Sequence, residues 1–134
     1  MVGIIICSHA DFCVGIKHSV EMIAGAQEKL VAVPFDGETQ LEDYGALIKE
    51  EVDKMEDGCI VLCDIQNGTP YNASLMAIAY TDNILISGMS LPMLLTLVIS
   101  RNQEGITVEE LANSVMDQKN DFVAKICSKD IFGE

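Results

Sequence analysis

Ile4-Ile5-Ile6-Cys7-Ser8-His9 is an apolar run that ends in a histidine. A nearly continuous apolar run over residues 2–7 is typical of a strand that is covered on both faces, as in a parallel sheet. The residues from 12 onward have helical spacing, and Asp11 is predicted to cap that helix. Because ligands in open α/β sheets bind at the carboxyl ends of strands, His9 is the first candidate for a functional residue.

Three more apolar runs predict buried strands, at residues 30–35, 59–63 and 84–87. Amphipathic or apolar helical segments are predicted between and after them, at residues 39–55, 71–80, 93–99 and 107–119. This alternation predicts an α/β fold, namely an open, mainly parallel, doubly wound sheet with helices on both faces. A last short strand over residues 122–127, antiparallel to the others, is left open. The whole chain, 1–134, is predicted to be one domain.

Composition and charge exclude several classes of protein. Hydrophobic residues make up 49% and charged residues 22% of the chain, which is typical of a globular protein. A net charge of −13 argues against nucleic acid and against an anionic membrane surface as partners. No apolar run approaches the roughly 20 residues of a membrane span, and no signal peptide is recognised. Five cysteines, an odd number without paired metal-ligand spacing, predict reduced thiols and a cytoplasmic protein.

Polar residues follow three of the predicted strands and are expected to meet at one edge of the sheet. The first strand ends in Ser8 and His9, the third in Asp64, and the fourth in Ser87. A carboxylate can hold one imidazole nitrogen protonated and leave the other free as a nucleophile. The loop that follows Asp64 offers backbone N–H groups, a hydroxyl and a helix N-terminus, which together suit a phosphate group. These loop residues are Asn67, Gly68 and Thr69.

Plainer interpretations stand beside this one. A lone histidine at a strand end is more often a surface residue than a nucleophile, and Asp64 could simply cap its loop. His18 lies on the polar face of its predicted helix and is taken as solvated. The chain has no P-loop lysine motif, no G-x-G-x-x-G and no G-x-S-x-G, so nucleotide-binding and hydrolase functions lack support. No convincing third metal ligand is found, and neither a metal nor a cofactor is expected.

Three motifs together resemble one known family, the IIA component of the mannose-family sugar phosphotransferase system. They occur in the family's order and spacing: Ile6-Cys7-Ser8-His9, Asp64-x-x-Asn67-Gly68-Thr69-Pro70-Tyr71-Asn72-Ala73-Ser74, and Ser87-Gly88-Met89-Ser90-Leu91-Pro92-Met93-Leu94. The chain has Ala10 where the family commonly has glycine, and Asn67 and Thr69 where it commonly has glycine and serine. Asparagine tolerates the conformation of glycine, and threonine keeps the hydroxyl.

The resemblance implies a phosphocarrier. Its catalytic residues would be His9, Asp64 and Thr69: the histidine accepts a phosphoryl group on Nε2 from the histidine phosphocarrier protein (HPr), while the aspartate holds Nδ1. The group then passes to a IIB component, which phosphorylates sugar that enters through the membrane components IIC and IID. The resemblance also implies a homodimer, in some members formed by exchange of a C-terminal strand, here residues 122–127. For docking of the two protein partners we expect an apolar ring formed by Phe12, Met89 and Leu91.

Other functions are left open by the residues. The related phosphotransferase subunit of dihydroxyacetone kinase shares the strand-end histidine, but its second motif differs from the Asn67-Gly68-Thr69-Pro70 loop. A flavodoxin-like regulatory module, such as a phosphoacceptor receiver, would need an acidic pair where this chain has Ser8-His9. A binding module with an inert His9 is the third alternative. The sugar also stays open among mannose, fructose, sorbose, galactosamine-type sugars and others.

Overall fold

The computed structural model describes residues 1–133 and contains one four-stranded sheet. The strand order is β2-β1-β3-β4, and each neighbouring pair is parallel. The strands are β1 (Gly3–His9), β2 (Leu30–Phe35), β3 (Cys59–Cys63) and β4 (Ile84–Ser87). The predicted open parallel sheet is therefore confirmed, with strands close to the apolar runs that predicted them.

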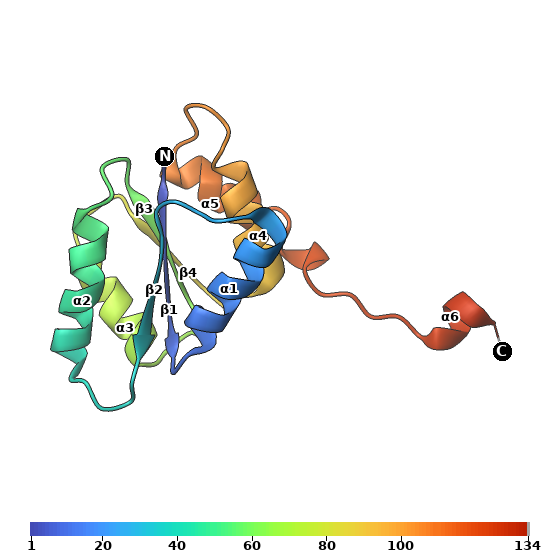
Figure 1. Ribbon diagram of the computed structural model, residues 1–134, viewed down its shortest axis with the longest axis horizontal. Helices are drawn as coiled ribbons and strands as arrows, with labels where there is room; N and C mark the ends of the chain where they lie inside the picture. The colour runs from blue at the N-terminus through green and yellow to red at the C-terminus, as the bar shows by residue number, and fades with distance from the viewer. Residues whose placement is uncertain (134) are drawn as a thin grey trace.

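Helices cover both faces of the sheet, as predicted. Figure 1 shows α2 and α3 on one face, and α1, α4 and α5 on the other. These helices are α1 (Phe12–Ala24), α2 (Leu41–Asp53), α3 (Thr69–Ala77), α4 (Leu91–Ser100) and α5 (Val108–Met116). Within residues 1–133, no helix has the length and apolar character that crossing a membrane requires.

Side chains of β1 alternate between the two cores. Ile4 and Ile6 belong to the core beneath α1, α4 and α5, whereas Ile5 and Cys7 belong to the core beneath α2 and α3. Because successive strand residues point to opposite faces, His9 falls on the same side as Ile5 and Cys7. This alternation directs the imidazole toward the start of α3.

The chain reverses its winding direction between β1 and β3. The connection from β1 leads to β2 on one side of β1, and the chain then returns to place β3 on the other side. In sheets of this kind the crevice at the switch point, outside the carboxyl ends of the strands, is where ligands bind. His9 ends β1 at this point, and Asp64 directly follows β3.

Some predicted helix starts are displaced by a few residues. Helix α3 begins at Thr69 and α4 at Leu91, two residues earlier in each case than predicted, because proline fits the first turn of a helix. Asp11 occupies the predicted N-cap position of α1, but among the described residues its side chain makes no capping hydrogen bond. The Oγ of Ser8 accepts from the N–H of Cys13 at 2.8 Å instead.

The C-terminal segment does not form the strand that was left open for it. A 3-10 turn (Lys119–Asp121) is followed by extended chain and by α6 (Ser128–Phe132), and this tail runs away from the body of the molecule (Figure 1). Within residues 1–133, the segment 122–127 pairs with no strand. Several tail side chains are apolar and exposed, namely Val123, Ile126, Ile131 and Phe132. A strand requires a neighbouring edge, and the tail meets none in this single chain.

Candidate phosphoryl-acceptor site

His9 and Asp64 form a hydrogen-bonded pair at the switch point. Nδ1 of His9 lies 2.8 Å from Oδ2 of Asp64, and the backbone N–H of His9 donates to the same oxygen at 3.0 Å. Parallel pairing of Cys7 with Cys63 brings the two strand ends into this register. The His9 side chain is 47% exposed, so its remaining nitrogen is within reach of another protein.

The surroundings of Asp64 favour the ionised form of its carboxyl group. Burial raises its pKa, but hydrogen bonds from the backbone N–H of His9, from the His9 ring and from the N–H of Ile65 outweigh burial and lower the pKa below its usual value. The Ile65 N–H donates to the second oxygen, Oδ1, at 3.0 Å. An ionised Asp64 can only accept a hydrogen bond, so Nδ1 carries the proton and donates it to the carboxylate. This fixes the tautomer in which Nε2 carries the lone pair.

The loop between Asp64 and α3 lies directly against the imidazole. A Cβ added to Gly68 would stand 3.3 Å from Cε1 of His9 and 3.6 Å from Nε2, so a side chain at this position would crowd the ring. Asn67 has a positive φ of 61°, which asparagine tolerates better than most residues. The first turn of α3 begins at Thr69 and carries amide N–H groups and the positive end of the helix dipole. The structure thus brings Asn67, Gly68 and Thr69 together beside His9.

Two other predicted site residues are placed where they cannot act as predicted. Ser8 is fully buried, and its hydroxyl is used at the start of α1, where it accepts from Cys13 and donates to the carbonyl of Ala10. Met89 is buried, and its N–H donates to the carbonyl of Cys63 at 3.0 Å. Met89 therefore adds nothing to an apolar surface, because it packs into the core beside α4.

The other two predicted docking residues do lie together. Phe12, at the start of α1, is half-exposed, and Leu91, at the start of α4, is half-buried. Both line one shallow hollow of about 390 Å³. This hollow lies over α1 and the start of α4, on the other face of the sheet from α3.

Sequence reasoning missed two residues near the imidazole. Ile65 directly follows Asp64 and is 54% exposed. Phe35, the last residue of β2, is paired in register with His9, and the two rings meet edge to face with centroids 6.1 Å apart. An apolar residue beside the motif aspartate was visible in the sequence. The contact with Phe35 depends on strand register, which a single apolar run does not specify.

The turn after His9 holds a strained residue. Ala10 has a positive φ of 49°, and its N–H donates to the carbonyl of Phe35 at 2.8 Å. A non-glycine residue in this conformation costs about 1–2 kcal/mol. This conformation turns the chain from β1 into α1, and the His9 side chain stays exposed at the end of the strand.

Taken together, the geometry suits the acceptance of a phosphoryl group by nitrogen. Nδ1 is held by an ionised carboxylate, so Nε2 is the ring nitrogen left free to act as a nucleophile, and the N-terminus of α3 is close enough to stabilise added negative charge. Among residues 1–133, no three histidine, cysteine, aspartate or glutamate side chains are grouped to hold a metal ion. Positioning and fixed dipoles are the principal requirements of phosphoryl transfer.

Known proteins resemble this chain over most of its length. The profile of the EIIA-man family, described as "PTS system fructose IIA component", matches residues 3–116. The fructose-specific EIIA component of the phosphotransferase system (PTS) of Bacillus subtilis (strain 168) is 35% identical over 136 residues, covering 96% of this chain and 88% of that protein. The sorbose-specific EIIA component of Lacticaseibacillus casei is 30% identical over 131 residues, covering 94% and 91%. A crystal structure of phosphotransferase system component EIIA from Streptococcus agalactiae has a TM-score of 0.84 and 33% identity, covering 93% and 97%.

Proposed function

This chain belongs to the EIIA-man family of sugar phosphotransferase-system IIA components, and from that membership we propose that His9 carries the phosphoryl group. IIA components of this family are phosphocarriers that work with HPr and a IIB component in sugar uptake. The dihydroxyacetone-kinase and regulatory-module alternatives are not favoured. The observation that supports His9 is its Nδ1 contact of 2.8 Å with Asp64, which leaves Nε2 free.

The proposed reaction exchanges one phosphorus–nitrogen bond for another. The Nε2 lone pair of His9 attacks the phosphorus of phosphorylated HPr, a new N–P bond forms, and the imidazole of HPr leaves with the electron pair of the broken bond. Asp64 stabilises the positive charge that develops on the His9 ring. The hydroxyl of Thr69 and the first N–H groups of α3 stabilise the phosphoryl oxygens. Transfer to the IIB component repeats the same steps with His9 as the leaving group.

A transfer assay tests this function. The chain is incubated with phosphoenolpyruvate, enzyme I and HPr, and its intact mass is measured. We expect a gain of one phosphoryl group that is labile in acid and stable in base, as phosphohistidine is. No gain, with an HPr shown to be active on another IIA component, would contradict the proposal and return His9 to a structural residue.

We propose that HPr and the IIB component dock on exposed apolar side chains that follow the carboxyl ends of the strands, at the same edge of the sheet as the acceptor. Phe12 and Leu91 share one hollow, and Ile65 is exposed beside Asp64. Phe12→Ala and Ile65→Ala are each expected to raise the KM for HPr about tenfold while kcat stays within about twofold, as for central interface residues. Met22→Ala is the matched control, because Met22 is an exposed apolar residue near the other end of α1. An unchanged KM in both variants would exclude these side chains from the docking surface.

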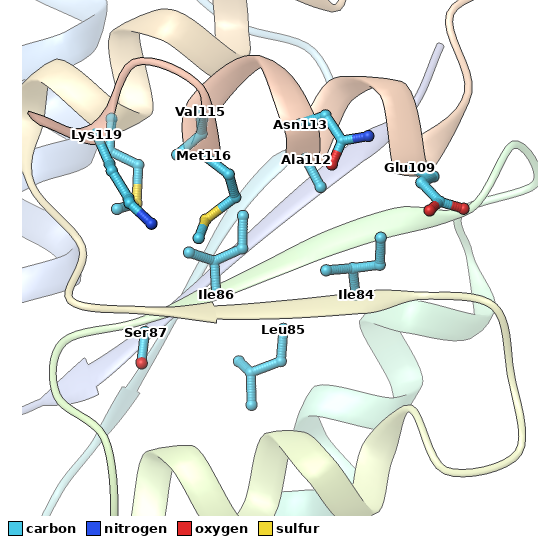
Figure 2. Close-up of a pocket in the computed structure, with 11 residues that line it drawn as sticks. Ile84, Leu85, Ile86, Ser87, Glu109, Ala112, Asn113, Val115, Met116 and Lys119 are labelled. Carbon is cyan, nitrogen blue, oxygen red and sulfur yellow. The ribbon is translucent and has the colours of Figure 1, made fainter.

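We also propose that the chain forms a homodimer through its C-terminal segment. β4 ends the sheet order, so among the described residues its outer edge is unpaired. Beside this edge, a hollow of about 480 Å³ lies between β4 and α5. Figure 2 shows Ile84 and Ile86 pointing toward α5, with Met116 above them, while Leu85 points to the opposite face. Segment 122–127 of a second copy, in which Val123 and Ile126 are exposed and Phe122 is partly buried, has the length and apolar character to cover such an edge.

Truncation tests this dimer. The full chain is expected to sediment as a dimer at about 20 μM, and the dimer fraction should fall on dilution. A variant that ends at residue 122, which keeps the contact of Phe122 with the core, is expected to be monomeric. A variant that ends at residue 127 is the control and is expected to remain dimeric, because it keeps the proposed strand. A monomeric full chain, or a dimer that survives the first truncation, would contradict the proposal.

We propose that these reactions take place in the cytoplasm. The five cysteines are free thiols in the structure, and four of them are buried. Free thiols of this kind fit a reducing compartment.

A further inference from the structure

We propose that Phe35 is a positioning residue for phosphoryl transfer, and this inference rests on the proposed function of His9. Phe35 ends β2 and is the register partner of His9, so the two side chains project from neighbouring strands to the same side. Their rings meet edge to face, with centroids 6.1 Å apart and an interplanar angle of 80°. The proposed role is to hold the imidazole in the orientation in which Nδ1 stays on Asp64 and Nε2 faces α3.

The imidazole has few other constraints. Its side chain is 47% exposed, and Asp64 holds it at only one atom. The covalent bond at Cγ and the hydrogen bond at Nδ1 fix two points of the ring, which leaves rotation about the axis through these two points. Gly68 lies close to Cε1 on the α3 side but offers no side chain to the ring. Phe35 is therefore the aromatic ring whose contact restricts this rotation.

Phe35 is itself held in place from the core. Its ring packs on Tyr44 of α2, with centroids 5.2 Å apart. Tyr44 is 1% exposed, and its hydroxyl donates to the backbone carbonyl of Val33 in β2. The buried Tyr44 thus restricts the motion of the half-buried Phe35 ring, and Phe35 in turn restricts the exposed His9 ring. An aliphatic side chain at position 35 fills similar space but offers no aromatic ring to the imidazole.

The inference predicts a loss in kcat rather than in KM. An imidazole that leaves its productive orientation for part of the time lowers the transfer rate, and small misplacements of a reacting group cost about tenfold to a hundredfold. We expect Phe35→Leu to lower kcat for phosphoryl transfer from phosphorylated HPr about tenfold, with KM within about twofold. Phe35→Tyr keeps the ring and is expected to retain kcat within about twofold.

The experiment measures kcat and KM for wild type, Phe35→Leu and Phe35→Tyr, together with the ¹⁵N shifts of the His9 ring. Tyr80→Leu is the matched control, because Tyr80 is a fully exposed aromatic residue after α3. In Phe35→Leu the ring nitrogens should shift toward a mixture of tautomers, whereas in Phe35→Tyr they should stay as in wild type.

The outcomes separate this inference from the function on which it rests. A wild-type chain that gains no phosphoryl group overturns the proposed function. A wild type that is phosphorylated on His9, with Phe35→Leu unchanged in kcat and in ¹⁵N shifts, overturns only the role of Phe35. A Phe35→Leu variant that changes KM alone also overturns it, because that result assigns Phe35 to partner docking. An equal loss of kcat in Phe35→Tyr overturns the requirement for an aromatic ring.

Discussion

His9→Ala will accept no phosphoryl group from HPr, and its fold will be retained. The variant removes the nucleophile, for which no neighbouring group can substitute. The stability cost is expected to be below about 1 kcal/mol, as for other exposed ion pairs. The His9 side chain is half-exposed, and its backbone N–H still donates to Asp64 after the substitution. Intact mass after incubation with phosphoenolpyruvate, enzyme I and HPr measures acceptance, and urea unfolding measures stability.

The second histidine supplies the control. The chain contains two histidines, and His18 is exposed on α1. His18→Ala should gain one phosphoryl group at the wild-type rate. Phosphorylation of His9→Ala, or loss of phosphorylation in His18→Ala, would contradict the assignment of His9. Unfolding of His9→Ala under assay conditions would show that His9 has a structural role that its exposure does not indicate.

Much of this fold could be predicted from the apolar runs in the sequence alone. The runs at 30–35 and 59–63 coincide with β2 and β3. β3 is buried along its whole length, as a continuous apolar run predicts, whereas β2 lies at the edge of the sheet and is only partly buried. The first residues of the helices were harder to predict from the sequence, since Thr69 and Pro70 are equally typical of a loop and of the first turn of a helix. The structure of the C-terminal tail was the hardest part to predict. Apolar residues at 122–127 indicate a strand, but among residues 1–133 this segment pairs with no strand.

The candidate site was partly predictable for a related reason. The pairing of His9 with Asp64 follows from their positions at the ends of neighbouring parallel strands. Phe35 was missed because its contact depends on which residue of β2 is in register with His9. Ser8 was assigned to the site because it lies at the end of the first strand, and Met89 because it is an apolar residue that follows the fourth strand. In the structure the Ser8 hydroxyl accepts a hydrogen bond at the start of α1, and Met89 is a core residue. Proximity in sequence does not determine the direction of a side chain.

Asp64→Asn is expected to lower kcat for phosphoryl transfer about a hundredfold, with little change in the KM for HPr. The ionised carboxylate fixes Nδ1–H and stabilises the positive imidazole that forms as Nε2 attacks. An asparagine side chain has a similar shape, but it carries no charge and can present its NH₂ group to Nδ1, which favours the wrong tautomer. Loss of an orienting aspartate beside a histidine costs up to about 10⁴-fold in serine proteases. Asp82→Asn, at an exposed position after α3, is the matched control for the loss of one charge.

The pH dependence of stability gives a second test of the same carboxylate. The pKa of Asp64 is lowered in the folded chain, because hydrogen bonds from His9 and Ile65 outweigh burial. A lowered pKa means that the unfolded state binds the proton more readily, so ionised Asp64 stabilises the fold above the ordinary aspartate value of about 3.9. That stabilisation is lost as the pH falls through the lowered value. Wild type should therefore exceed Asp64→Asn in unfolding free energy at about pH 5, and the difference should shrink by about pH 2. A difference that stays constant over this range, or a kcat equal to that of wild type, would mean that Asp64 neither pairs with nor orients His9.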